Sequence, residues 1–164
     1  MKNGVLLFGV LAIVFAACIS PPDYPVEPQI KFQGLSKNTM RQGRLGTEDS
    51  LFLTLTFTDG DGDLGVPDTN KDSSKIINIF LTDKRDNKPA ERYRLPYIPE
   101  QGAGNGISGD IRLLLFTTCC NVLPPCEAST TKPIDTLVYE VYIKDRAGHE
   151  SNRVLTAPIY LQCK

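Results

Sequence analysis

The sequence predicts an all-β domain, a β-sandwich of about seven strands. Runs of strand length, rich in β-branched and aromatic residues, recur along the chain between segments rich in Gly, Pro and Asp. No segment has the apolar spacing and capping residues of a helix. The chain has 164 residues, of which 41% are hydrophobic and 23% charged, which is typical of a single globular domain.

The expected strands follow one another from residue 29 to the C-terminus, so residues 29–164 are assigned to one domain of immunoglobulin-like type. They are Gln29–Gly34, Leu51–Thr58, Lys75–Thr82, Glu91–Ile98, Asp110–Thr117, Thr136–Lys144 and Val154–Gln162. In such a sandwich, successive connections alternate between its two ends. The connections 59–72 and 145–153 are therefore expected at one end, and residues 119–133 at the other.

The N-terminal residues 1–17 have the features of a cleaved signal peptide. Lys2 precedes 13 apolar or small residues, Val5–Ala17, which is shorter than the roughly 20 residues that cross a bilayer. The sequence Phe15-Ala16-Ala17-Cys18 resembles a bacterial lipobox, although Leu is usual at the position of Phe15. This resemblance implies cleavage before Cys18 and its modification by acyl chains such as palmitate. The alternative is an ordinary signal peptide with a chance cysteine.

Residues 18–28 are expected to form a lipidated cysteine followed by a proline-rich tether. The tether would extend for roughly 30 Å at about 3.1 Å per residue. Several acyl chains on Cys18 would make a stable membrane anchor. We therefore expect the protein in the bacterial cell envelope, most often the outer membrane, facing either the periplasm or the cell surface.

The cysteine count fits an oxidising compartment. If Cys18 carries lipid, an even set of four remains, Cys119, Cys120, Cys126 and Cys163. A bridge between the two adjacent cysteines would need a strained ring. Cys126 and Cys163 are therefore each expected to pair with one of them. The alternative, a zinc site, lacks the paired Cys-x2-Cys spacing.

The connection Asp59–Asp72 carries the strongest chemical signal in the sequence. It holds five carboxylates within 14 residues, and three of them alternate with Gly. Crowded carboxylates repel one another unless a cation lies among them, and flexible oxygen ligands suit Ca²⁺. The expected ligands are Asp59, Asp61, Asp63, Asp68 and, from the connection at the same end, Asp145. The alternative is a solvated turn, because Asp and Gly are common turn residues.

The loop does not match an EF-hand. Leu64 stands at the sixth position, where Gly is required, and Asn70 at the twelfth, where Glu is required. The flanking segments are also expected to be strands and not helices.

Two segments resemble a known family. Phe57–Gly65 (FTDGDGDLG) and Asp145–Asn152 (DRAGHESN) are similar to loops of small bacterial lipoproteins with immunoglobulin-like or cadherin-like domains. His149 stands where Asn is usual in these loops, so the resemblance assigns it no ligand role. It covers about residues 29–162 and implies a fold and a location, while most such proteins have no assigned activity.

Signals of enzymatic chemistry are weak. Gly104–Gly109 has the spacing G-x-G-x-x-G, but a strand and not a helix is expected after it, which disfavours a nucleotide site. A catalytic triad of Ser151, His149 and Asp145 is disfavoured, because these residues are only two and four positions apart on one loop and such neighbours seldom adopt triad geometry. We therefore expect a protein that is not an enzyme.

The partner class follows from charge and aromatic content. The net charge of −1 supplies no basic excess for nucleic acid. Four strand tyrosines, Tyr93, Tyr97, Tyr139 and Tyr142, could form a glycan platform, although strand tyrosines more often pack half-buried. The sequence therefore predicts a membrane-anchored binding or structural module with a Ca²⁺-ordered loop end. The alternatives are a lipoprotein that binds a glycan or peptide and, less favoured, a hydrolase with two converging carboxylates.

Overall fold

The computed structural model describes residues 23–43, 49–67, 76–99, 106–121, 126–129 and 131–164. The chain is all-β, as expected, with ten strands and no helix in these residues. The strands are β1 (Gln29–Leu35), β2 (Thr39–Arg41), β3 (Ser50–Asp59), β4 (Ile79–Asp83), β5 (Lys88–Tyr93), β6 (Ile107–Phe116), β7 (Ile134–Leu137), β8 (Tyr139–Ile143), β9 (Val154–Leu155) and β10 (Ile159–Gln162).

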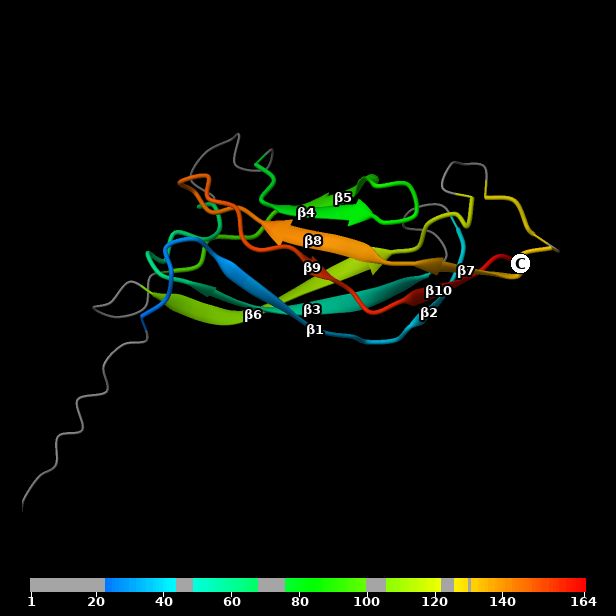
Figure 1. The fold of residues 1–164 in the computed structure, drawn as a ribbon, viewed down its shortest axis with the longest axis horizontal. Coiled ribbons are helices and arrows are strands. Elements are labelled where there is room, and N and C mark those ends of the chain that lie inside the picture. Colours follow the sequence, from blue (N-terminus) through cyan, green and yellow to red (C-terminus); the bar gives the residue numbers. More distant parts are fainter. Residues whose placement is uncertain (1–22, 44–48, 68–75, 100–105, 122–125, 130) are drawn as a thin grey trace, which may run out of the picture.

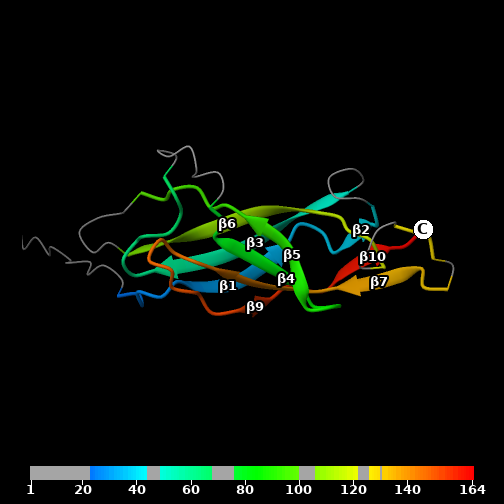
Figure 2. The same ribbon diagram turned by 90° about the horizontal axis from the view of Figure 1, so that it is seen from above.

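The strands form three sheets, with the orders β1-β3-β6, β5-β4-β8-β9 and β2-β10-β7. All neighbours are antiparallel except β2 and β10, which run parallel. Figure 1 shows β4, β5 and β8 in one layer above β1, β3 and β6. The third sheet extends the molecule towards the C-terminus, as the view from above in Figure 2 also shows. This arrangement is consistent with a β-sandwich.

The core lies between the layers because the buried side chains alternate along the strands. Leu51, Leu53 and Leu55 of β3 are at most 2% exposed, whereas the residues between them face outward. Leu81 of β4 and Val141 of β8 belong to the same buried cluster. The alternation of residues that predicted the strands is therefore also the pattern that places apolar side chains in the core.

Two of the expected strands are each divided in the structure. Residues 136–144, expected as one strand, separate at Val138 into β7, which pairs with β10, and β8, which pairs with β4 and β9. Residues 154–162 separate into β9 and β10 around Pro158, which has no backbone N–H to donate. The chain therefore changes sheets within each of these runs.

The boundaries of two other strands differ from the expectation. β4 begins at Ile79, later than the expected Lys75, and Ile76 and Ile77 before it are exposed. β5 begins at Lys88, earlier than expected, because Asn87 adopts a left-handed conformation (φ 57°) that closes a tight hairpin after β4. β2, which has three residues, was not expected.

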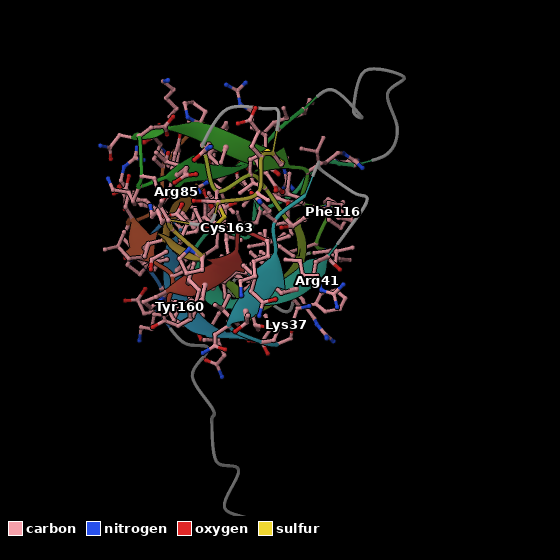
Figure 3. All side chains as sticks on the ribbon, turned by 90° about the vertical axis from the view of Figure 1, so that its right-hand side faces the viewer. Lys37, Arg41, Arg85, Phe116, Tyr160 and Cys163 are labelled. Carbon is pink, nitrogen blue, oxygen red and sulfur yellow. A yellow bond between two sulfur atoms is a disulfide. The ribbon has the colours of Figure 1, made fainter. Side chains whose placement is uncertain are left out.

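Two disulfides lie in the half of the molecule that holds the C-terminus. Cys119 pairs with Cys126, and Cys120 pairs with Cys163. Both bridges follow the expected pattern, in which each of the two adjacent cysteines has a different partner. Sulfur atoms in disulfides are not thiolates, so these four cysteines do not form a zinc site. Disulfides of this kind are typical of a non-cytoplasmic protein. Figure 3 looks onto this end, where the side chain of Cys163 is labelled.

A buried ion network that the sequence did not reveal lies beside these bridges. Arg85, with a side chain 10% exposed, donates to Asp83 (2.6 Å) and to Asp135 (2.8 Å). Its guanidinium also donates to the backbone oxygen of Cys119 (3.0 Å). The network connects the β4–β5 hairpin to β7 and to the disulfide segment. Because these charges are removed from water, the loss of any one partner would leave another charge buried without compensation.

The N-terminal segment differs from a free tether. The signal peptide and Cys18 lie outside the described residues, which begin at Asp23. From Tyr24 onward the chain contacts the domain: the N–H of Gly60 donates to the oxygen of Pro25 at 2.8 Å, and Pro28 is buried. Within the described residues no helix has the length and apolar character needed to cross a bilayer.

Candidate metal-binding site

Four aspartates from two loops meet at the end of the molecule opposite the C-terminus. Asp59 is the last residue of β3 and is fully buried, because the alternation of β3 continues through it. Asp61 and Asp63 follow in the loop, and Asp145 follows β8 with 8% exposure. One carboxylate oxygen from each lies within 4.8 Å of the others. Asp68, the fifth expected ligand, lies outside the described residues.

Hydrogen bonds hold the two loops together. The N–H of Arg146 donates to the backbone oxygen of Asp63 at 3.3 Å, and the N–H of Ala147 donates to its Oδ2 at 3.0 Å. The Arg146 guanidinium donates to the oxygen of Gly65 at 3.2 Å. Asp145 therefore reaches the acidic loop through a defined contact, as the sandwich topology predicted.

The third loop at this end closes over the acidic loop. The N–H of Val66 donates to the oxygen of Leu95 at 3.2 Å. Gly65 has a φ of 79°, and a Cβ at this position would lie 2.0 Å from the oxygen of Pro96. Only glycine fits there, because the site combines a left-handed backbone with a close approach of a second chain segment.

Three of the carboxylates have an oxygen that is buried without a hydrogen-bond partner in the structure. These oxygens are Oδ1 of Asp59, Asp61 and Asp63. The second oxygen of Asp59 accepts from the N–H of Leu64 at 3.2 Å, and that of Asp63 accepts from Ala147. Buried polar atoms are nearly always paired, so three unpaired carboxylate oxygens in one cluster are suited to a shared positive partner. The cluster could therefore hold a metal ion.

Asp145 is held differently from the other three. Its Oδ1 accepts from the N–H groups of Gly148 (2.6 Å) and His149 (2.8 Å), which shapes the turn after β8. Its Oδ2 lies 2.8 Å from Nδ1 of His149. This hydrogen bond to Asp145 raises the pKa of the His149 imidazole above its usual value. Asp145 is thus pre-positioned by its own loop, and its Oδ2, which has one hydrogen-bond partner, retains a further lone pair.

The electrostatics of the cluster show an excess of negative charge. Burial, followed by the neighbouring charges of Asp61, Asp63 and Asp145, raises the pKa of Asp59 to about 6. Burial and the same kind of repulsion also raise the pKa of Asp63. A divalent cation among these oxygens would remove both causes of instability, because it replaces lost water ligands and neutralises charge.

The other residues singled out in the sequence do not assemble a catalytic site. Oγ of Ser151 donates to the oxygen of Asn152 and accepts from the N–H of Ile143, so its hydroxyl is engaged by backbone groups and not by His149. β6 begins at Ile107, within the glycine-rich segment 104–109, and the chain continues as strand and not as a helix to Phe116. That position excludes the dinucleotide fingerprint.

The four tyrosines do not form one platform. Tyr139 is 1% exposed, and the Tyr93 hydroxyl is engaged by Glu91 and by the oxygen of Leu114. Tyr142 stacks on Phe80 of the neighbouring strand. The remaining one, Tyr97, is 43% exposed and lies near the aspartate cluster, where the guanidinium of Arg146 packs 5.4 Å from its ring centroid.

An open groove of about 630 Å³ runs over the outer face of β1, β3 and β6. Its lining includes Tyr24, Lys31, Thr56 and Asp110 but none of the four clustered aspartates. This groove is therefore separate from the four clustered aspartates.

Comparison of the chain with protein-family profiles finds no match, and comparison with curated proteins and with solved structures finds no significant similarity.

Proposed function

We propose that this protein is a non-catalytic envelope lipoprotein whose loop end is ordered by one Ca²⁺ ion. The observation that carries the proposal is the convergence of Asp59, Asp61 and Asp63, each with a buried and unpaired oxygen, on Asp145. The ion would fix the loops at that end and would take part in no chemical step.

The donor set favours a hard cation. All four side chains of the described cluster offer carboxylate oxygens, and none offers sulfur. The nearby imidazole of His149 is already bonded to Asp145. Irregular loop ligands suit Ca²⁺, which accepts six to eight oxygens in flexible geometry, better than Mg²⁺, which requires a near-ideal octahedron. Backbone oxygens and water would complete the coordination.

An immunoglobulin-like sandwich is the fold we propose for the arrangement of sheets. Two antiparallel sheets face each other, and the strand run β7–β8 and the run β9–β10 each pass between sheets. The gathering of the acidic loop and the Asp145 loop at one end supports the same assignment.

The lipid anchor on Cys18 and the envelope location are proposed from the signal sequence and supported by the disulfides. Metabolic labelling with palmitate tests the anchor. We expect the label in the wild-type protein and none in Cys18→Ala. Label retained in Cys18→Ala would refute the assignment.

Titration calorimetry of the purified protein tests the metal site. We expect heat of binding and a higher Tm with millimolar Ca²⁺, because modules of this kind bind in the range of about 10⁻⁴–10⁻³ M. Mg²⁺ should give a smaller rise in Tm at the same concentration. Asp59→Asn should lose the response to Ca²⁺.

The matched control is Asp110→Asn, which removes an exposed carboxylate of β6 outside the cluster. This variant should respond to Ca²⁺ like the wild type. A wild-type protein with neither heat nor a change in Tm would overturn the metal site. An equal loss of response in both variants would show that only general charge matters.

A further inference from the structure

The chain enters the domain at the same end as the metal-binding cluster. The N–H of Gly60, between two of the clustered aspartates, donates to the oxygen of Pro25 at 2.8 Å. A Cβ at Gly60 would lie only 2.2 Å from the oxygen of Tyr24, so the N-terminal segment is packed directly on the acidic loop. Figure 1 shows this blue segment at the end opposite the labelled C-terminus.

The length of chain between the anchor and this contact is short. Five residue steps separate Cys18 from Asp23, the first described residue, and even a fully extended chain of that length reaches only about 18 Å. A lipid on Cys18 would therefore keep the acidic-loop end next to the bilayer. The disulfide end, at the other end of the long axis, would point away (Figure 1).

Exposed apolar side chains gather at the end that the anchor would hold near the bilayer. Ile76 is 45% exposed, Ile77 37% and Tyr97 43%. Asn78 directly follows the two isoleucines, and its side chain accepts a hydrogen bond from the Leu95 N–H at 2.6 Å. This bond brings the isoleucines next to the segment before Tyr97. Val26, 47% exposed, follows directly after Pro25.

We propose that the loop end formed by Ile76, Ile77 and Tyr97 docks on the bilayer that carries the anchor. This inference rests on the lipid anchor of the proposed function and adds an orientation and a contact surface to it. Tyrosine suits the depth of the headgroups, because its ring is apolar and its hydroxyl can remain hydrated. Arg146, exposed beside Tyr97 and bonded to the oxygen of Gly65, adds a positive charge to this surface.

A single-tryptophan experiment tests the orientation, because the natural chain contains no Trp. The full lipidated protein is reconstituted with Ca²⁺ in phosphatidylcholine vesicles, with or without lipids brominated on their acyl chains, which quench nearby Trp. Tyr97→Trp and Ile77→Trp report on the loop end. Tyr160→Trp, at a residue 41% exposed on β10, is the matched control from the other end.

We expect brominated lipid to quench the two loop-end reporters several times more strongly than Tyr160→Trp. Two loop-end positions are used so that one poorly folded variant does not decide the result, and each variant must keep the wild-type Tm. Protein that floats with the vesicles but shows equal or absent quenching at the loop end overturns the docking surface and leaves the anchor intact. Protein that does not float with the vesicles overturns the anchor and the docking together.

Discussion

Asp59 is a residue whose charge opposes folding and would favour the binding of a cation. Its side chain is fully buried, and its Oδ1 has no partner. Burial and three neighbouring carboxylates raise its pKa to about 6, so the residue is mostly ionised at pH 7.5 under these unfavourable conditions. The free energy of unfolding without metal should therefore include a penalty from this one group.

Asp59→Asn should consequently stabilise the metal-free protein while it removes the response to Ca²⁺. Removing the charge relieves the repulsion, and we expect a gain of about 1–2 kcal/mol in the free energy of unfolding. Urea denaturation with a chelator at pH 7.5 measures it. A metal-free variant clearly less stable than the wild type would show that Asp59 serves mainly through its hydrogen bond to Leu64.

Glu91 is a half-buried carboxyl that lies far from any sequence motif. Burial raises its pKa from 4.5 to about 7. The hydroxyl of Tyr93 contacts Glu91 and lies 2.9 Å from the oxygen of Leu114, to which it donates. A phenol has one hydrogen, so when Tyr93 donates to Leu114 its oxygen is free to accept from protonated Glu91. The contacts thus suit the neutral acid.

Glu91 should make stability fall as pH rises. Between pH 4.5 and about 7 its carboxyl is protonated in the folded state and ionised in the unfolded state. The folded state then binds more protons, and the free energy of unfolding decreases as pH increases through this window.

Glu91→Gln should remove this part of the pH dependence. Relative to the wild type, the free energy of unfolding of the variant should rise between pH 4.5 and 7 and stay about 1–2 kcal/mol higher above pH 7. Partial exposure of the side chain screens the charge and limits the difference to this size. Urea denaturation at a series of pH values measures the difference, with the exposed Glu127→Gln as control. A difference that does not change with pH would contradict the buried-acid interpretation.

At the scale of elements, the sequence could predict which residues face the core but not which strand pairs with which. In residues 135–143 every second side chain is buried without interruption, although β7 and β8 belong to different sheets. Side-chain alternation reports the face of a sheet and contains nothing about hydrogen-bond partners. Pro158 was a signal for the break in the last run. β2 gave none, because Met40 is the only buried residue among its three.

The candidate site was more predictable than the sheets. The acidic loop was visible in the spacing of Asp59, Asp61 and Asp63, and the topology of a sandwich assigned Asp145 to the same end. The contact between the N-terminal segment and Gly60 was not predictable. A glycine between aspartates also suits an ordinary turn, and the close approach of Tyr24 depends on tertiary packing.

Gly60→Ala should detach the N-terminal segment from the acidic loop. The added Cβ would meet the backbone oxygen of Tyr24 at 2.2 Å, and backbone atoms cannot rotate away as a flexible side chain can. Hydrogen exchange should become faster at the residue 60 amide, whose partner is Pro25, while the amides of β3 and β6 keep their protection.

Gly34→Ala is the matched control, because a Cβ there meets nothing within 4 Å. It should leave the exchange at residue 60 unchanged. Equal exchange in the wild type and in Gly60→Ala would mean that the segment shifts without losing its hydrogen bond.

At the scale of the whole molecule, the two disulfides should stabilise the protein unequally. Cys120–Cys163 closes a separation of 43 residues, and Cys119–Cys126 closes one of 7. The chain-entropy estimate gives about 4 kcal/mol for the longer loop and about 2 kcal/mol for the shorter one.

Guanidinium denaturation of two double-alanine variants measures this difference. Cys120→Ala with Cys163→Ala should lower the unfolding midpoint more than Cys119→Ala with Cys126→Ala. The reverse order would show that the shorter bridge matters through the backbone oxygens it presents to Arg85.

The first described residues and the C-terminus lie at opposite ends of the molecule, which has a mechanical consequence (Figure 1). A pull between them runs along the strands, because β1 leaves the end that holds the N-terminal segment and β10 finishes beside the C-terminus (Figure 1). We expect such a load to shear the hydrogen bonds of β1 and β10 with their neighbours together, because it runs parallel to these strands. Covalent attachment of Cys163 to Cys120 secures the last strand against that force.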